Sequence, residues 1–424
     1  MIQTLRNAWK IPELRKKLMF TLLVLLLYRI GNVIPVPFIN TDLLSTYFNS
    51  VLSNTILGLY NAMSGSAFAQ ASVLALSIQP YINASIIIQL LTVAIPALER
   101  MAKEDGEEGK KKLTLITRYT TVGLGLLMGW AYYTMINNYG IVTEEGILPA
   151  LVIVLAFTAG SAVVMWLGEQ ITEFGIGNGI SMILFANIVS RFPNSVTSLF
   201  SMGWSGLIVA VVVVALVIFV VFINDAERRI PIQYAKRVVG RKVYGGQNTN
   251  LPIKVSMSGV MPVIFAQSIV SILPTIFAFT NPDGTSESAF VQFFINISDQ
   301  HSWFYAVSYG LLIFFFSWFY STIQYDPVEI ANNLKKNGGF IPGFRPGKPT
   351  ADFIQKVINK IVIFGAVYLS VVALMPIVAG NIFDSATNLG IGGTTTIIVV
   401  GVALETVQAI EAQMLMRHYK GFLD

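Results

Sequence analysis

Very few ionisable side chains lie in the long apolar runs of this sequence. Arg29 lies in the first run, and Glu405 and Glu411 lie in the last. Proton relays and ion-coupled transporters need ionisable groups in the membrane interior, and apart from Arg118 and Lys360, which we count with the cytoplasmic loops, the apolar runs offer only these. A polytopic secondary solute transporter therefore stays an alternative only. It would take up a solute saturably without partners, and would need a polar pocket near the middle of the membrane.

Residue patterns that perform enzymatic chemistry do not occur either. The absence of cysteine excludes disulfides, thiolate metal sites and cysteine nucleophiles. His301 and His418 are the only histidines and lie far apart, and no catalytic triad, metal set or carboxylate pair occurs. The GIGNG stretch at residues 175–179 indicates a helix start and not a phosphate loop, because no strand precedes it and no Lys-Ser/Thr follows. We expect no enzymatic activity, no metal and no cofactor.

The composition is that of an all-α polytopic membrane protein. Hydrophobic residues make up 54% of the 424 positions and charged residues only 12%, against about a quarter charged in soluble domains. The N-terminal arm leads into an apolar run without a small-residue cleavage site, so we expect a retained first helix. Ten apolar runs are interpreted as membrane spans: residues 18–36, 71–95, 113–136, 147–167, 176–189, 204–223, 255–279, 303–323, 357–375 and 394–416.

The positions of the basic residues support ten spans. Lys and Arg collect beside the cytoplasmic ends of spans. With the N-terminus inside, all of the 28 Lys and Arg except Arg29 and Arg191 fall in the N-terminal arm, three cytoplasmic loops and the C-terminal tail. Omitting the short fifth run, 176–189, would move the later basic loops outside. We therefore expect both termini in the cytoplasm.

Ten spans divide into five and five at the polar segment 190–203. Because five is odd, a second five-helix unit would enter the membrane from the opposite face, which is the arrangement of an inverted repeat. The sequence thus predicts an N-terminal half over residues 1–190 and a C-terminal half over residues 191–424, with cytoplasmic loops at 224–254 and 324–356.

Two adjacent segments in the first half differ from ordinary spans. Residues 57–70 are rich in Gly, Ser and Ala and too short to cross a bilayer, so they predict a short helix that does not span. Residues 71–95 have the length of a span but include polar groups that lipid would not solvate, namely Gln79, Asn83, Ser85, Gln89 and Thr92. A pore would need both features: a polar span such as 71–95 for its wall, and a short helix such as 57–70 as a movable obstruction.

Two long cytoplasmic loops follow in the second half. Residues 224–252 alternate in stretches such as IPIQYA, which predicts a β-hairpin closing at Gly240 or at Gly245 and Gly246. Residues 324–350 predict a short helix from Asp326 or Pro327, stopped by glycines, and then a Pro/Gly turn that presents Arg345. Basic loops can simply lie on anionic lipid headgroups, but loops of this length are usually functional. We interpret them as a docking surface for a large partner.

Four segments resemble signature segments of the SecY family, the protein-conducting channels of the bacterial general secretion pathway. They read QPYINASIIIQLLTVAIPALERMAKEDGEEGKKK, ITEFGIGNGISMILFANIV, IPIQYAKRVVGRKVYGGQNTNLPIKV and GGFIPGFRPGKPT. The resemblance implies ten transmembrane helices in two inverted halves, a clamshell hinged outside the fifth helix. It opens sideways to lipid between the second and third helices on one side and the seventh and eighth on the other. It also implies transport of unfolded secretory polypeptides across the bacterial cytoplasmic membrane and sideways release of transmembrane segments.

The resemblance assigns roles to residues of this chain. The pore ring matches Ile82, Ile86, Leu184, Ile264 and Ile398, where Leu184 stands at a position that is Ile in some members. The plug, at about residues 57–70, matches Leu57, Tyr60, Asn61, Met63, Ser64, Gly65, Ser66 and Phe68. The lateral gate matches Asn83, Gln89, Gln267 and Ser268. The docking surface matches Arg228, Arg229, Lys236, Arg237, Arg241, Lys242, Lys335, Lys336, Arg345 and Lys348.

Partners follow from the same resemblance. SecE would brace the back of the channel and SecG would join as a small subunit. SecA or a translating ribosome would dock on the cytoplasmic loops, without any direct specificity for nucleic acid. The substrate would be a translocating polypeptide or its signal sequence, and membrane lipids would surround the helices.

Overall fold

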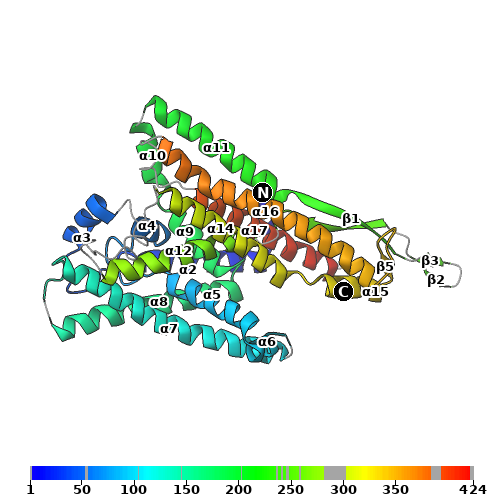
Figure 1. The fold of residues 1–424 in the computed structure, drawn as a ribbon, viewed down its shortest axis with the longest axis horizontal. Coiled ribbons are helices and arrows are strands. Elements are labelled where there is room, and N and C mark those ends of the chain that lie inside the picture. The colour runs from blue at the N-terminus through cyan, green and yellow to red at the C-terminus, as the bar shows by residue number, and fades with distance from the viewer. Residues whose placement is uncertain are drawn as a thin grey trace.

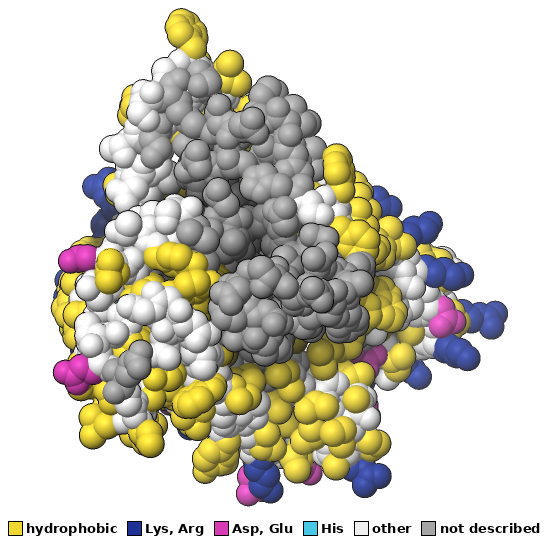
Figure 2. Space-filling view, turned by 60° about the vertical axis from the view of Figure 1, so that its left-hand side comes forward, with side chains coloured by type: hydrophobic (Ala, Val, Ile, Leu, Met, Phe, Trp, Pro, Cys, Tyr) yellow, Lys and Arg dark blue, Asp and Glu magenta, His cyan; other side chains and the backbone are white. Residues whose placement is uncertain are grey.

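A computed structural model gives the fold, which is mostly helical (Figure 1). The structure describes residues 2–52, 56–103, 105–144, 146–201, 203–234, 237–239, 242–244, 248–256, 259–280, 302–382 and 393–420. In Figure 1 the helices α5, α7 and α8 lie on one side of the molecule and α11, α14 and α16 on the other, and strands project at one end. Hydrophobic side chains cover much of the described surface in Figure 2.

The helices follow the apolar runs. Those of the first half are α1 (Ile2–Lys10), α2 (Pro12–Gly31), α3 (Thr41–Tyr47), a π-helical turn (Phe48–Leu52), α4 (Ile56–Met63), α5 (Gln79–Ala94), α6 (Pro96–Lys103), α7 (Gly106–Asn138), α8 (Ile147–Phe174) and α9 (Gly179–Val189). Those of the second are α10 (Phe192–Ser201), α11 (Trp204–Asp225), α12 (Met261–Thr280), α14 (Trp303–Gln324), α15 (Pro327–Lys336), α16 (Lys348–Ile382) and α17 (Gly393–Lys420).

Each of the ten predicted spans overlaps one of these helices. Not all of the helices have the length and hydropathy of an ordinary membrane span. Among the described residues, five helices are long and apolar enough to cross a membrane, or six if α5 and α6 count as one bent span. Helix α9 has only 11 residues. The helical nature of the fold is confirmed, and the count of ten spans stays a prediction.

The second predicted span is shorter than its apolar run. The run covers residues 71–95, but the helix α5 begins only at Gln79 and the residues before it form turns. Ala71 and Ser77 have φ values of 43° and 50°, a left-handed conformation that does not continue an α-helix. Pro80 then occupies the first turn of α5, where proline is tolerated. Pro96 ends the helix because it has no N–H, and the chain bends by 107° into α6.

The two long loops of the second half form one unit. Strand β1 (Glu227–Tyr234) pairs antiparallel with β4 (Asn248–Lys254), so the predicted hairpin is confirmed. Strands β2 (Arg237–Val239) and β3 (Lys242–Tyr244) pair with each other in a separate two-stranded sheet, while Gly240, Gly245 and Gly246 lie outside the described residues. Strand β5 (Gly339–Phe340), from the other loop, pairs with the end of β1. The hairpin and the second loop are therefore joined by backbone hydrogen bonds.

An apolar cluster fixes this unit on the membrane helices. Ile230, Ile232 and Ile253 of the hairpin pack with Leu334 of α15 and with residues of α16, among them Ile354 and Ile358. Helix α15 starts where it was predicted, because the Asp326 carboxylate accepts hydrogen bonds from the N–H groups of Val328 (2.8 Å) and Glu329 (3.2 Å). Burial of this cluster gives the loops a defined shape.

The orientation of the loops can be tested directly, because the chain has no native cysteine. We expect Pro342→Cys, in the loop between α14 and α16, to react only with a membrane-impermeant maleimide on the cytoplasmic side. Glu144→Cys, between α7 and α8, should react only from outside, since both side chains are exposed and the two loops are predicted on opposite faces. Labelling is compared in spheroplasts and inverted vesicles. Reaction of Pro342→Cys in intact spheroplasts would contradict the ten-span topology.

Candidate functional site

The short helix α4 contacts α9 and α12 and lies towards the end of the molecule opposite the strands (Figure 1). It has 8 residues, so the prediction of a short helix that does not span is confirmed. All eight predicted plug residues lie in the described part of the chain. Leu57, Tyr60, Asn61, Met63, Ser64, Gly65 and Phe68 are buried, and Ser66 is partly buried. The structure thus encloses this segment in the protein and does not leave it on the surface.

Local hydrogen bonds shape the turns that follow α4. The Asn61 carboxamide oxygen accepts from the Ala69 N–H at 3.0 Å. The Ser64 hydroxyl accepts from the Phe68 N–H and donates to the Asn61 carbonyl, both at 3.1 Å. Tyr132 of α7 donates its hydroxyl proton to the Phe68 carbonyl at 2.7 Å, and the two rings meet edge-on with centroids 4.6 Å apart. The segment is folded on itself and anchored to α7.

The five predicted ring residues come from four helices and are all buried. Ile82 and Ile86 lie on α5, Leu184 on α9, Ile264 on α12 and Ile398 on α17, and each is at most 3% exposed. They belong to one hydrophobic cluster, which also contains Leu57, Met63 and Phe68 of the predicted plug. The structure therefore brings the ring residues and the plug segment into the same apolar centre.

The predicted lateral-gate residues lie on two helices in contact, α5 and α12. Asn83, Gln267 and Ser268 are buried, and Gln89 is partly exposed. Beside Gln89 a cavity of about 440 Å³ lies between α5, α7 and α14, lined by side chains that include Thr92, Thr117, Tyr320 and Ile323. The amides are thus placed along a helix contact that continues into a cavity.

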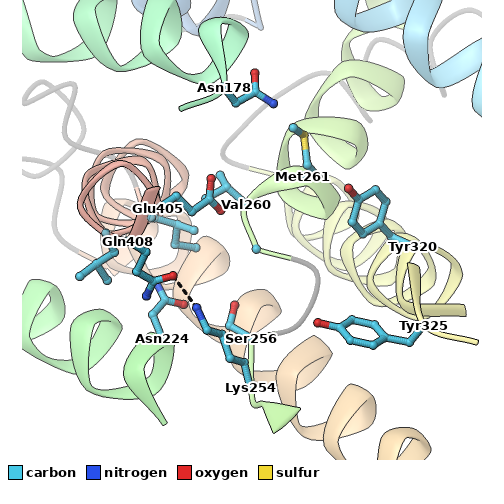
Figure 3. Close-up of a pocket in the computed structure, with 14 residues that line it drawn as sticks. Asn178, Asn224, Lys254, Ser256, Val260, Met261, Tyr320, Tyr325, Glu405 and Gln408 are labelled. Atoms are coloured by element: carbon cyan, nitrogen blue, oxygen red, sulfur yellow. Dashed lines mark hydrogen bonds between the residues drawn. The ribbon is translucent and has the colours of Figure 1, made fainter. Parts of the chain in front are cut away.

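A second cavity, of about 400 Å³, lies where the hairpin joins the helices (Figure 3). Lys254 at the end of β4 donates to the Gln408 carboxamide oxygen on one side, and Tyr320 and Tyr325 line the other side. Glu405 of α17 also faces this cavity. The cavity is polar, and sequence analysis did not predict it, although Glu405 was noted as one of the few ionisable groups in the apolar runs.

The predicted docking residues lie at the end of the molecule that carries β1, β5 and α15 (Figure 1). The described side chains are all exposed: Arg228, Arg229, Lys335, Lys336, Arg345 and Lys348. Lys236 and Arg241 lie outside the described residues, and of Arg237 and Lys242 only the strand backbone is described. Among these cations Arg229 is bonded to Glu227 at 2.6 Å. Together with Arg229, the other described cations place exposed positive charge at this end of the molecule.

The family model for SecY matches residues 72–407 of this chain. The chain belongs to the SecY family. A SecY-family relative from Streptomyces scabiei, a protein translocase subunit SecY, is 43% identical over 443 residues, and the alignment covers 100% of both chains.

Solved structures agree with this SecY-family fold. One describes a SecY protein whose plug domain stabilises the closed state of the translocation channel, with a TM-score of 0.65 at 16% identity over 94% of this chain and 92% of that chain. Another is Sec61 in a canine ribosome–channel complex from the endoplasmic reticulum, with a TM-score of 0.62, 16% identity and the same coverage. At this identity they show the fold of the chain.

One polar cluster at the centre of this SecY-family fold was missed by sequence analysis. The Asn187 carboxamide of α9 contacts the Tyr28 hydroxyl of α2, the Met63 carbonyl and the Ser77 hydroxyl. The only sequence feature that could have indicated this cluster was a lone amide, Asn187, in the apolar run ISMILFANIV. Its partners could not be read from the sequence, because Met63 precedes Asn187 by 124 positions.

Proposed function

We propose that this chain is the channel-forming subunit of a protein translocase and not an enzyme. It moves unfolded secretory polypeptides across the bacterial cytoplasmic membrane and releases transmembrane segments sideways into lipid. The observation that supports this most directly is a short helix, α4, which contacts α9 and α12 and is buried in the same apolar cluster as branched side chains of α5, α9, α12 and α17. Membership of the SecY family over the whole chain supports the same function.

In the proposed channel, Ile82, Ile86, Leu184, Ile264 and Ile398 form the constriction and residues 57–70 form the plug. Branched apolar side chains suit this task because they offer no ligand to ions, and a narrow apolar constriction excludes water. They also make no sequence-specific contact with a passing chain. The plug is joined to α5 by turns and not by a continuous helix, and such a connection lets a short element leave and return.

The proposed sideways exit lies between α5 and α12. Asn83, Gln267 and Ser268 are polar groups buried along this contact. Amide and hydroxyl groups lower the cost of wetting a helix interface, because water can replace their protein partners when the helices separate. The cavity between α5, α7 and α14 then supplies space beside the opening.

The docking surface is proposed to receive SecA or a translating ribosome, with SecE and SecG as further subunits. Two basic loops that merely lay on lipid headgroups would not need a common fold. Here β5 of one loop adds to β1 of the other, and both pack on α16. A shaped surface of this kind favours a protein or ribosomal partner. We place the two termini and this surface on the cytoplasmic side, with halves 1–190 and 191–424 related as an inverted repeat.

Reconstitution tests the proposed function against the transporter alternative. We expect the chain to copurify with SecE from mild detergent. In proteoliposomes with SecE, SecA and ATP, it should protect a secretory precursor from added protease. A translocation channel has no solute site to saturate, so vesicles with this chain alone should show no saturable solute uptake. Saturable uptake together with failure to translocate would favour the transporter.

A further inference from the structure

Asn187 is the centre of a fully buried hydrogen-bonded cluster. Its Nδ2 donor lies 2.7 Å from the Met63 carbonyl oxygen, 2.8 Å from the Tyr28 hydroxyl and 3.3 Å from the Ser77 hydroxyl. The Tyr28 and Ser77 hydroxyls are themselves 3.1 Å apart. Asn187 and Tyr28 are 0% exposed and Ser77 is 1% exposed. These groups are closed off from bulk solvent, so each hydrogen bond depends on the position of the segment that supplies its partner.

The contacts of this cluster join the predicted plug to the rest of the protein. Met63 is the last residue of α4, and a carbonyl at a helix C-terminus has no partner within its own helix. Asn187 supplies that partner from α9. Asn32, which directly follows α2, contributes a longer contact, from its side-chain amide to the Ser64 carbonyl at 3.4 Å. Both bonds end on backbone carbonyls at the point where the plug turns back towards α5.

We propose that Asn187, oriented by Tyr28 and Ser77, is the latch that holds the plug segment in its closed position. This inference rests on the proposed function, in which residues 57–70 are a plug. The latch acts through the single bond to the Met63 carbonyl, because Tyr28 and Ser77 lie outside the plug and keep their contacts with Asn187 when the plug leaves.

Arg29 gives the latch a second state. Its Nη1 atom and the Asn187 Oδ1 atom are buried and make no hydrogen bond within the described part of the chain. Both lie against Gly65, at 2.6 Å and 2.9 Å from the place that a Cβ atom there would occupy. Gly65 has a φ of 67°, so glycine is needed both for its conformation and for space. The guanidinium nitrogen is a donor and the carboxamide oxygen an acceptor, and both lie beside the same point of the plug, so we expect the two to pair when Gly65 withdraws with the plug.

Asn187→Leu tests the latch. Loss of one buried hydrogen bond shifts a two-state equilibrium by about five- to tenfold, so we expect the idle conductance in planar bilayers to rise by that factor. Ser66→Cys, at a partly exposed position of the plug, should also react faster with a thiol reagent added outside. Thr158→Val is the matched control, because the Thr158 hydroxyl is buried but bonds only to Val154 within α8. Tyr28→Phe is a milder variant that removes one hydroxyl and should show a smaller rise.

Arg29→Met tests the second state and separates a latch from simple packing. Arg29→Met should slow the labelling of Ser66→Cys during translocation. This effect should vanish in the Asn187→Leu background, because leucine has no carboxamide oxygen with which Arg29 could pair. Unchanged conductance and labelling in Asn187→Leu, or an equal change in Thr158→Val, would overturn the latch.

If deletion of residues 61–68 leaves the idle channel closed, the plug itself is refuted. A leaking deletion with a tight Asn187→Leu channel refutes only the latch.

Discussion

Replacing both Ile82 and Ile86 with glycine should make the idle channel conduct ions. The two side chains are one helical turn apart on α5, share a face and are each 3% exposed. Glycine removes the branched carbons that exclude water, and a constriction that is wider and wetter no longer forms a barrier to ions. We expect idle conductance in planar bilayers to rise by at least about tenfold.

Controls separate this effect from damage to the fold. Glycine lowers helix stability by about 1 kcal/mol per site relative to alanine. Ile87→Gly is the control for this backbone effect, because it places a glycine in the same helix outside the predicted ring. Ile87 lies on the same helix but is only partly buried, and it should leave the conductance unchanged. The Ala pair at positions 82 and 86 should leak less than the Gly pair. A Gly pair that folds, translocates and stays as tight as the wild type would contradict a pore role for these residues.

Local sequence patterns were sufficient to predict those elements whose structure is determined by residues close to one another in the chain. Asp326 and Pro327 mark the start of α15, because a side-chain cap and an N-terminal proline act within one helical turn. The alternation in IPIQYA gave the hairpin strand β1, with Ile230 and Ile232 buried on one face. The short α4 followed from its length and small residues.

Features that depend on distant segments could not be predicted. The pairing of β5 with β1 joins loops separated by α12 and α14. The contact of Asn187 with Met63 spans 124 positions. The late start of α5 was missed because apolarity alone does not reveal the left-handed residues Ala71 and Ser77. The ring residues were reached by family resemblance, since an isoleucine that faces a pore and one that faces lipid look alike in sequence.

Arg345→Glu should abolish SecA-driven translocation while leaving folding and insertion intact. The side chain is exposed on a turn between Gly343 and Gly347, which have φ values of 88° and 103°. The Thr350 hydroxyl donates to the Arg345 carbonyl at 2.8 Å, and the rings of Phe344 and Phe353 lie 4.3 Å apart. The turn is therefore fixed before any partner arrives, and the guanidinium is presented at low entropic cost.

The chemistry of the guanidinium sets the size of the expected effect. Its planar donors can bind a carboxylate, a backbone carbonyl or an RNA phosphate with two parallel hydrogen bonds. Glutamate replaces this attraction with repulsion of an acidic acceptor, and loss of a close charged contact at an interface costs about 2 kcal/mol or more. We expect translocation of a secretory precursor into proteoliposomes, with SecA and ATP, to fall by at least about tenfold. Arg345→Lys should recover only part of the rate, because an ammonium keeps the charge but lacks the paired donors.

A matched charge reversal decides whether the position or only the net charge matters. Lys356 is exposed on α16, near the same basic surface, but is not held by the glycine turn. Lys356→Glu changes the net charge by the same amount, so general electrostatic attraction would make the two variants equally slow and more sensitive to salt. A specific contact instead predicts a large loss for Arg345→Glu and a small one for Lys356→Glu at physiological ionic strength. Translocation at the wild-type rate by Arg345→Glu would exclude a coupling role for this arginine. Equal losses in both variants would show that Arg345 contributes only to the net charge of the surface.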